Sequence, residues 1–125
     1  MDRLKQRQEF IEVAKGARLH RNSFSLQALR RASSDTSPRV GFTVTKKTGN
    51  AVERNRIRRR LKAAATAAGL SLSSGIDYVL IGRRAALAVD FSRLCDEIGK
   101  AARTIDPDRP GNRRPRPAAN QARAT

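Results

Sequence analysis

Apolar residues recur at the spacing of an α-helix in three parts of the chain, two of which lie near its ends. The first pattern covers residues 6–15, and Gly16 follows it where a left-handed C-terminal cap is expected. Its apolar positions are Phe10, Val13 and Ala14. The last pattern follows Asp90, a candidate N-cap, and predicts a helix with a buried stripe. The positions of that stripe are Phe91, Leu94, Cys95, Ile98, Ala102 and Ile105.

Two segments alternate apolar and polar residues with a period of two, and they predict strands at residues 24–29 and 39–45. Residues 32–38 between them are rich in Ser, Asp and Pro, as in a hairpin connection. A continuous apolar run at residues 78–81, between Gly75 and Gly82, is typical of a central strand. The order of elements predicts one small mixed α/β domain and leaves room for one further short strand.

The third helical pattern runs from Val52, and its apolar positions fall on one face: Ile57, Leu61, Ala64 and Ala68. Asn50 is a plausible N-cap with Glu53 three residues later, and Gly69 is a plausible stop. Nearly every other position on the wheel is cationic. Like charges four residues apart destabilise a helix by about 0.2–0.5 kcal/mol per pair, a cost that an anionic partner would offset.

The positive charge of the chain is concentrated at this helix. Residues 46–62 hold eight of the 27 cations and a single acid, Glu53. Five of the eight are Arg, whose planar fork matches phosphate better than the ammonium of Lys does. The alternative is a solvated charged face with no partner, but such a face tolerates mixed signs. The pattern therefore favours a surface that binds nucleic acid.

Composition divides the chain into a folded body and a tail. All 26 Leu, Ile, Val and Phe residues lie between Leu4 and Ile105, so residues 1–105 are predicted to fold and residues 106–125 to form a disordered basic tail. The formal charge of +16 over 125 residues predicts a polyanionic partner that neutralises it. Nucleic acid is the favoured partner, and the alternatives are an anionic membrane surface and an acidic protein. No apolar run is long enough to span a bilayer, and no signal peptide is visible, so we expect a cytoplasmic protein.

The sequence contains few candidate catalytic residues. Cys95 and His20 are each the single residue of their kind, which excludes an internal disulfide and a multi-thiolate metal site. The eleven acids are thinly spread, and the adjacent Asp96 and Glu97 point to different sides of a helix. Cys95 lies in the apolar stripe and is expected to be buried. We therefore expect no catalytic residue, no metal site and no cofactor bound by the protein itself.

One long motif carries a family resemblance. Residues 39–61 read RVGFTVTKKTGNAVERNRIRRRL, with the pattern Lys-Lys-x-Gly-Asn-Ala-Val-x-Arg-Asn-Arg from Lys46 to Arg56. This run resembles the signature of the bacterial ribonuclease P protein subunit. An amino-terminal Leu-Lys-x-Arg-x-x-Phe from Leu4 to Phe10 and the segment DYVLIGRR at residues 77–84 support the resemblance, which covers roughly residues 3–105.

The resemblance implies the α+β class: a mixed α/β sandwich with about four strands, three helices and an unusual left-handed crossover through the basic helix. It implies a ribonucleoprotein in which a large RNA subunit removes the 5′ leader of precursor tRNA. The expected partners are the ribonuclease P RNA subunit and precursor tRNA, with one protein copy per RNA and Mg²⁺ acting through the RNA.

Carried over by motif, the resemblance assigns an RNA-docking surface and a leader cleft. The RNA-docking residues are Lys46, Lys47, Asn50, Arg54, Asn55, Arg56, Arg58, Arg59, Arg60 and Lys62. The resemblance places the cleft for the single-stranded leader between the sheet and the first helix. Phe10 and Val13 on that helix would line the cleft together with residues of the central sheet, although Phe10 is equally expected to be a core residue. Many relatives carry a second aromatic one turn after the Phe10 position, where this chain has Ala14.

Two other functional classes stay open from the sequence. A generic RNA-binding or ribosomal-type protein would share the basic helix and the basic tail without any processing activity. A protein-only nuclease would cleave precursor tRNA without RNA, which the sparse acids make unfavourable. Cleavage assays with and without an RNA subunit separate the three classes.

Overall fold

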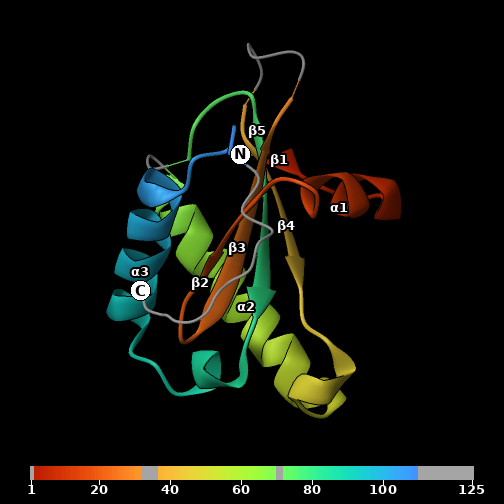
Figure 1. Cartoon of the computed structure of the whole chain (residues 1–125). Coiled ribbons are helices and arrows are strands. Elements are labelled where there is room, and N and C mark those ends of the chain that lie inside the picture. The colour runs from red at the N-terminus through yellow and green to blue at the C-terminus, as the bar shows by residue number, and fades with distance from the viewer. Residues whose placement is uncertain (1, 32–36, 70–71, 110–125) are drawn as a thin grey trace.

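The computed structural model describes residues 2–31, 37–69 and 72–109 of the chain. Its sheet lies between α1 on one side and α2 with α3 on the other, which is the predicted α+β sandwich (Figure 1). In chain order the elements are β1 (Asp2–Arg3), α1 (Arg7–Val13), β2 (Ala17–His20), β3 (Phe24–Arg30), β4 (Arg39–Thr43), η1 (Lys46–Thr48), α2 (Ala51–Ala67), β5 (Ile76–Gly82), η3 (Arg84–Leu87) and α3 (Phe91–Thr104). Most of the predicted 32–38 connection and residues 110–125 of the predicted tail lie outside the described residues.

Within the described residues the strands follow the order β1-β4-β5-β3-β2. The three predicted strands are β3, β4 and β5, and β4 pairs in parallel with β5, so that Val40 lies beside Tyr78. Helix α2 connects these two parallel strands, as a crossover requires. The left-handed sense of that crossover stays a prediction. β3 runs antiparallel to both β5 and β2.

Two short strands at the edges of the sheet were not placed from the sequence. β2 has four residues, of which only Ala17 and Leu19 are apolar, so its alternation is too brief to stand out. β1 has two residues and pairs in parallel with β4. Both become strands because a longer neighbour offers them backbone hydrogen bonds. Within the described residues, β2 brings the sheet to the expected four strands, and the two-residue β1 adds a fifth.

The larger core lies between the sheet and the pair of helices α2 and α3. Its most deeply buried large side chains are each at most 1% exposed: Phe24, Leu26, Tyr78 and Leu80 from the sheet, Ile57 and Leu61 from α2, and Leu94 and Ile98 from α3. Each fully buried side chain of this size contributes about 1.5–3 kcal/mol to folding. A smaller cluster of Leu4, Val13 and Val79 lies under α1 on the opposite face of the sheet.

The predicted start of the basic helix is confirmed. Asn50 accepts a hydrogen bond on Oδ1 from the Glu53 backbone N–H at 2.9 Å, and Glu53 Oε1 accepts one from the Asn50 N–H at 3.0 Å. This reciprocal pair is a capping box. Asp90 is also the N-cap residue of α3, as predicted, but its side chain makes no capping hydrogen bond.

The expected left-handed cap at Gly16 is wrong. Helix α1 ends at Val13, its C-cap Ala14 is right-handed, and among the described glycines only Gly75 has a positive φ, of 78°. Gly16 is required for space instead, because a Cβ atom there would lie 2.2 Å from the carbonyl oxygen of Ala28. The glycine lets the chain leave α1 and pass close to β3.

Two positions of the predicted α3 stripe are not buried as expected. Phe91 is 42% exposed, because the first turn of α3 extends past the edge of the core. Cys95 is half-buried at the margin of the α2–α3 contact, where it lines a hollow with Ala67, Ala68 and Gly99. The remaining positions of the stripe are in the core.

Candidate nucleic-acid interface

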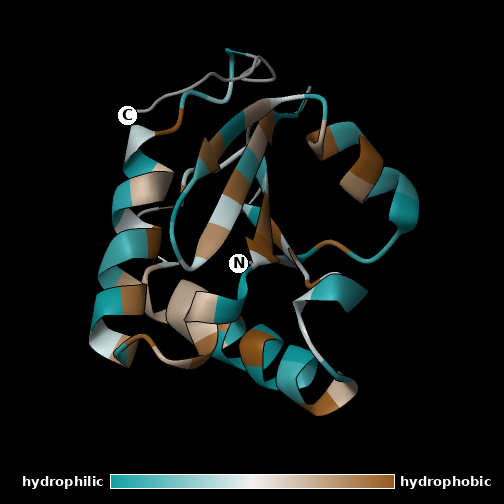
Figure 2. Ribbon diagram, turned by 60° about the horizontal axis from the view of Figure 1, so that its bottom comes forward, coloured by the Kyte–Doolittle hydropathy of each residue, from teal (hydrophilic) through white to brown (hydrophobic). Residues whose placement is uncertain are grey.

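Helix α2 presents its cations outward because its apolar residues are all used on one side. Ile57, Leu61, Ala64 and Ala65 are fully buried against the sheet and α3. The opposite side carries Asn55, Arg58, Arg59 and Lys62, which we call the basic face. The N-terminal half of α2 is mostly hydrophilic in Figure 2. The chain thus presents concentrated positive charge on a rigid helix.

The basic face borders a hollow of about 290 Å³ between α2 and the edge of the sheet. Arg3 of β1 and Phe42 of β4 complete its lining, and the Arg3 guanidinium lies over the Phe42 ring, 5.7 Å from the centroid. Arg58 donates a hydrogen bond to Asn55 Oδ1 at 2.8 Å, which orients both side chains. The lining therefore has four cations and one amide, a set suited to phosphate, around a Phe42 side chain that is only 8% exposed.

The other predicted RNA-docking residues of α2 are placed differently. Arg60 donates to the backbone carbonyl of Val89, and its Nε is buried without a partner, so its guanidinium is directed toward the loop before α3. Arg54 donates to the carbonyl of Gly49 at 2.9 Å and supports the start of the helix. Arg56 is exposed on a side of α2 away from the basic face. The structure therefore separates the predicted set into outward cations and cations that bind the protein's own backbone.

The loop before α2 adds two further cations, Lys46 and Lys47, which are exposed on η1. A clamp at the start of α2 holds this loop. Arg84 of η3 donates to Glu53 Oε2 at 2.6 Å and to the Thr48 carbonyl at 3.0 Å. The Arg84 hydrogen bond, together with that from the Asn50 backbone, lowers the pKa of Glu53 to about 2. The single acid of residues 46–62 is thus paired.

A groove between α1 and the sheet lies next to the basic face, and we call it the α1 groove. Its volume is about 270 Å³, and it is lined by Arg7, Phe10, Gln27, Phe42, Thr43 and Val79. Phe10 packs against β4 where Gly41 leaves space, since a Cβ atom at Gly41 would lie 2.5 Å from the Phe10 ring. Phe42 lines both the α1 groove and the hollow beside α2. The two surfaces therefore meet at one aromatic residue.

The structure corrects one of the two predicted cleft residues. Phe10 is half-buried and lines the α1 groove. Val13 is 0% exposed and packs with Leu4 and Val79, so it supports the groove from beneath and cannot contact a bound strand. Ala14 is exposed at the C-terminal end of α1 and does not line the groove.

Several groove residues were not identified from the sequence. Gln27 and Thr43 alternate with core residues along β3 and β4, so the pattern showed a second sheet face. The resemblance placed the cleft between the first helix and the sheet, but the pattern did not show which sheet residues line it, because α1 reaches them through contacts distant in sequence. Arg3 and Arg7 were not identified as lining residues for the same reason, since their neighbours in the two hollows lie far away in sequence.

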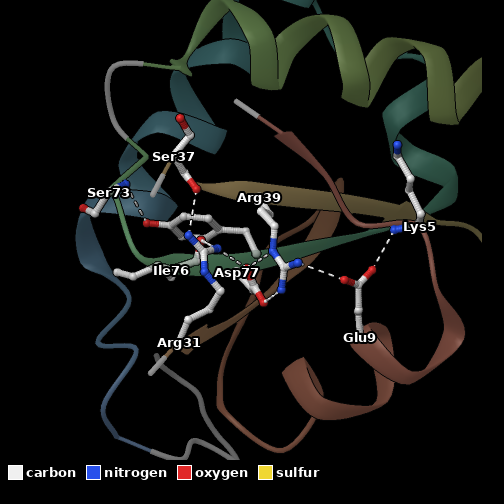
Figure 3. Close-up of polar contacts among 9 residues, drawn as sticks. Lys5, Glu9, Arg31, Ser37, Arg39, Ser73, Ile76 and Asp77 are labelled. Atoms are coloured by element: carbon white, nitrogen blue, oxygen red, sulfur yellow. Dashed lines mark hydrogen bonds and ion pairs between the residues drawn. The ribbon is translucent and has the colours of Figure 1, made fainter. Parts of the chain in front are cut away.

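A network of ion pairs lies at one end of the sheet, beside α1 (Figure 3). Asp77 of β5 accepts hydrogen bonds from Arg39 and Arg31, and its side chain is only 7% exposed. Burial raises the pKa of the Asp77 carboxyl, but the hydrogen bonds from the two arginines outweigh this and hold it below its ordinary value. Arg39 also pairs with Glu9 of α1 at 2.9 Å.

Six of the acids in the described ranges form ion pairs, among them Glu9, Glu53 and Asp77. Within the described ranges, no group of three or more His, Cys, Asp or Glu residues is arranged to hold a metal ion. Nor does this part of the chain contain a helix long and apolar enough to cross a membrane.

Comparison with known proteins agrees with this geometry. The family model described as Ribonuclease P matches residues 1–106. The ribonuclease P protein component of Brucella melitensis biotype 1 is 42% identical over 121 residues, which cover 90% of this chain and 85% of that protein. The chain belongs to the ribonuclease P protein family.

Further members of the ribonuclease P protein family support the assignment and the fold. The protein component from Caulobacter vibrioides is 39% identical, over 90% of this chain and 77% of its own length. The solved ribonuclease P protein of Thermotoga maritima shares the fold with a TM-score of 0.72 at 22% identity, covering 85% of this chain and 99% of that one. The family match spans every described element, including the basic face and the α1 groove.

Proposed function

We propose that this chain is the protein subunit of a ribonuclease P ribonucleoprotein, in which an RNA subunit removes the 5′ leader of precursor tRNA. The observation that carries the proposal is the meeting of the basic face and the α1 groove at Phe42. One surface is suited to a folded RNA and the other to a single strand. A generic basic protein requires only the first.

The basic face and the η1 lysines bind phosphates of the RNA subunit in this proposal. Arg58, Arg59 and Lys62 extend from a helix whose opposite side is fixed in the core, so their positions are set before binding. Lys46 and Lys47 extend the same positive surface beyond the start of α2. Neutralising phosphates in this way accounts for the high net charge of the chain.

The α1 groove holds the leader of precursor tRNA in the same proposal. Single-stranded RNA is recognised by stacking on aromatic side chains and by contacts to its backbone. Phe10 supplies the accessible aromatic surface of the groove and Arg7 an exposed cation, while Phe42 and Gln27 are buried, at 8% and 5% exposed, and form its floor. Mature tRNA has no leader, so the groove distinguishes substrate from product.

The chemical step is assigned to the RNA, with Mg²⁺ acting through it. The protein contributes electrostatically, by neutralising phosphates and by extending the contact to the substrate. The acids of the described residues are dispersed, which does not suit a two-metal nuclease site. We further propose one protein copy per RNA and a cytoplasmic site of action.

The decisive experiment is multiple-turnover cleavage of precursor tRNA at low Mg²⁺ by a bacterial ribonuclease P RNA, with and without the chain. Stimulation by the chain, together with no cleavage by the chain alone, is the expected result. Cleavage by RNA-free protein would identify a protein-only nuclease. RNA binding without stimulation would identify a generic RNA-binding protein.

Phe10→Ala tests the groove within that assay. The variant is expected to bind precursor tRNA more weakly by about 1–3 kcal/mol, the contribution of one stacked base, and to bind mature tRNA as before. Because Phe10 also packs on the smaller core cluster, the comparison requires a cooperative melt near the parent temperature. Equal weakening for precursor and mature tRNA would place the leader elsewhere.

A further inference from the structure

Arg39 joins three elements through one guanidinium group. It is the first residue of β4, and its Nε and Nη2 donate to the two carboxylate oxygens of Asp77 on β5, at 2.8 and 2.6 Å. Its Nη1 donates to Glu9 Oε2 on α1 at 2.9 Å (Figure 3). Asp77 thus fixes the plane of the guanidinium and directs one N–H toward α1. A Lys side chain lacks this fork and cannot serve both carboxylates with the same geometry.

The Glu9–Arg39 pair links the two walls of the α1 groove. Glu9 precedes Phe10, which lines one wall, and Arg39 begins the strand whose Phe42 lines the other. The Phe10 ring lies directly against the backbone of β4 at Gly41. A tilt of α1 relative to β4 therefore changes the shape of the groove.

Helix α1 depends on such contacts for its orientation. It has seven residues, and isolated helices shorter than about 12–15 residues are marginal in water. Val13 anchors its C-terminal end in the smaller core cluster. Glu9 anchors its N-terminal half to the sheet, and the side chains of this pair are only 26% and 31% exposed.

We propose that Glu9 and Arg39 are positioning residues for leader binding: their ion pair holds α1 at the angle that keeps the α1 groove competent for a single strand. The inference rests on the proposed function, because it assigns the leader to this groove. Neither residue needs to contact RNA. A fraction of molecules in which α1 is displaced would weaken leader binding in proportion to the competent fraction that remains.

Glu9→Gln isolates the pair from the capping role of Glu9. Oε1 of Glu9 accepts hydrogen bonds from the backbone N–H groups of Lys5 and Gln6 at 2.9 and 3.0 Å. Gln retains an oxygen for this cap, as capping boxes allow. Its NH₂ group then faces the Arg39 guanidinium, donor against donor, and the link to the sheet is lost.

Glu12→Gln is the matched control. Glu12 lies on the same helix, pairs with Lys15 just after the helix end at 3.2 Å, and accepts a hydrogen bond from Gln8 at 3.1 Å. Both variants remove one negative charge from α1, so any general gain in RNA affinity is the same for both. The difference between them reports the Glu9–Arg39 link alone.

The measured quantity is the affinity of the holoenzyme, the chain bound to a bacterial ribonuclease P RNA, for precursor tRNA relative to mature tRNA. Glu9→Gln should reduce this ratio by about three- to tenfold, the range that one lost hydrogen bond corresponds to. Glu12→Gln should leave it at the wild-type value. Arg39→Lys should reproduce the effect of Glu9→Gln, and the double variant should add no further loss because the link is already broken.

Amide hydrogen exchange of the free chain gives a second readout that needs no RNA. Glu9→Gln should accelerate exchange in α1 relative to Glu12→Gln, while α2 and α3 stay protected. Equal exchange in α1 for the two variants, or equal precursor-to-mature ratios, would overturn the positioning role. A wild-type holoenzyme that binds precursor and mature tRNA equally would instead refute the proposed function, and with it the role of the pair in leader binding. The hydrogen-exchange comparison would still decide whether the pair holds α1 in place.

Discussion

The salt dependence of RNA binding tests the basic face most directly. We expect the triple variant Arg58→Ala, Arg59→Ala, Lys62→Ala to lose up to three phosphate contacts with the RNA subunit. Each lost contact reduces the log–log salt slope by about 0.7–0.9, so the slope should become shallower by about 2–2.7. Between 50 and 200 mM salt, the wild-type chain should therefore lose about 20- to 40-fold more affinity than the variant does.

A charge-matched control separates this surface from net charge. The triple variant Arg93→Ala, Lys100→Ala, Arg103→Ala also removes three cations, but from α3, whose residues do not line the hollow beside α2. Its slope should change much less. Arg60→Ala is a second control, because its guanidinium binds the Val89 carbonyl, and its loss should lower the melting temperature more than the slope.

The assay is equilibrium binding of the labelled RNA subunit at fixed Mg²⁺ over a series of monovalent salt concentrations. All variants must first show a cooperative melt. A wild-type slope in the basic-face variant would refute the reasoning, and so would equal reductions in the basic-face and α3 variants. The second result would mean that the RNA responds to total charge and not to this face.

Three further predictions concern stability and the tail. Hydrogen bonds from Arg84 and the Asn50 backbone lower the pKa of Glu53 to about 2, so the ionised carboxylate stabilises the fold above about pH 4.5 and loses that effect as the pH falls toward 2. Melting temperatures of the wild type and Glu53→Gln should converge over that range, and a constant difference would contradict the pairing. Gly16→Ala should destabilise the fold by about 1–3 kcal/mol in denaturant titrations, because its Cβ would meet the Ala28 carbonyl oxygen at 2.2 Å; an unchanged midpoint would contradict this packing. Truncation after Arg109 removes four arginines and no acid, so the salt slope of RNA binding should become shallower. The truncated chain should keep a cooperative melt, and loss of the melt would show that the tail is structural.

The local pattern of the chain determined its helices and longer strands, and with them the exposed charge of α2. Once Ile57, Leu61 and Ala64 occupy one side of a helix, a period of 3.6 residues directs most of the remaining cations outward, whatever that side packs against. The capping box at Asn50 is equally local, since it spans only the four residues 50–53. These features could be predicted because every interaction that produces them lies within a few residues of sequence.

The tertiary structure alone decided which cations stay available and which sheet residues line the α1 groove. Arg58 and Arg60 are indistinguishable by residue type, but Arg60 meets the Val89 carbonyl, 29 residues away, while Arg58 lies beside Phe42 of the sheet. The α1 groove likewise joins side chains from α1, β3, β4 and β5. Strand order and helix placement depend on the packing of the whole core, and the periodicity of the sequence does not predict them.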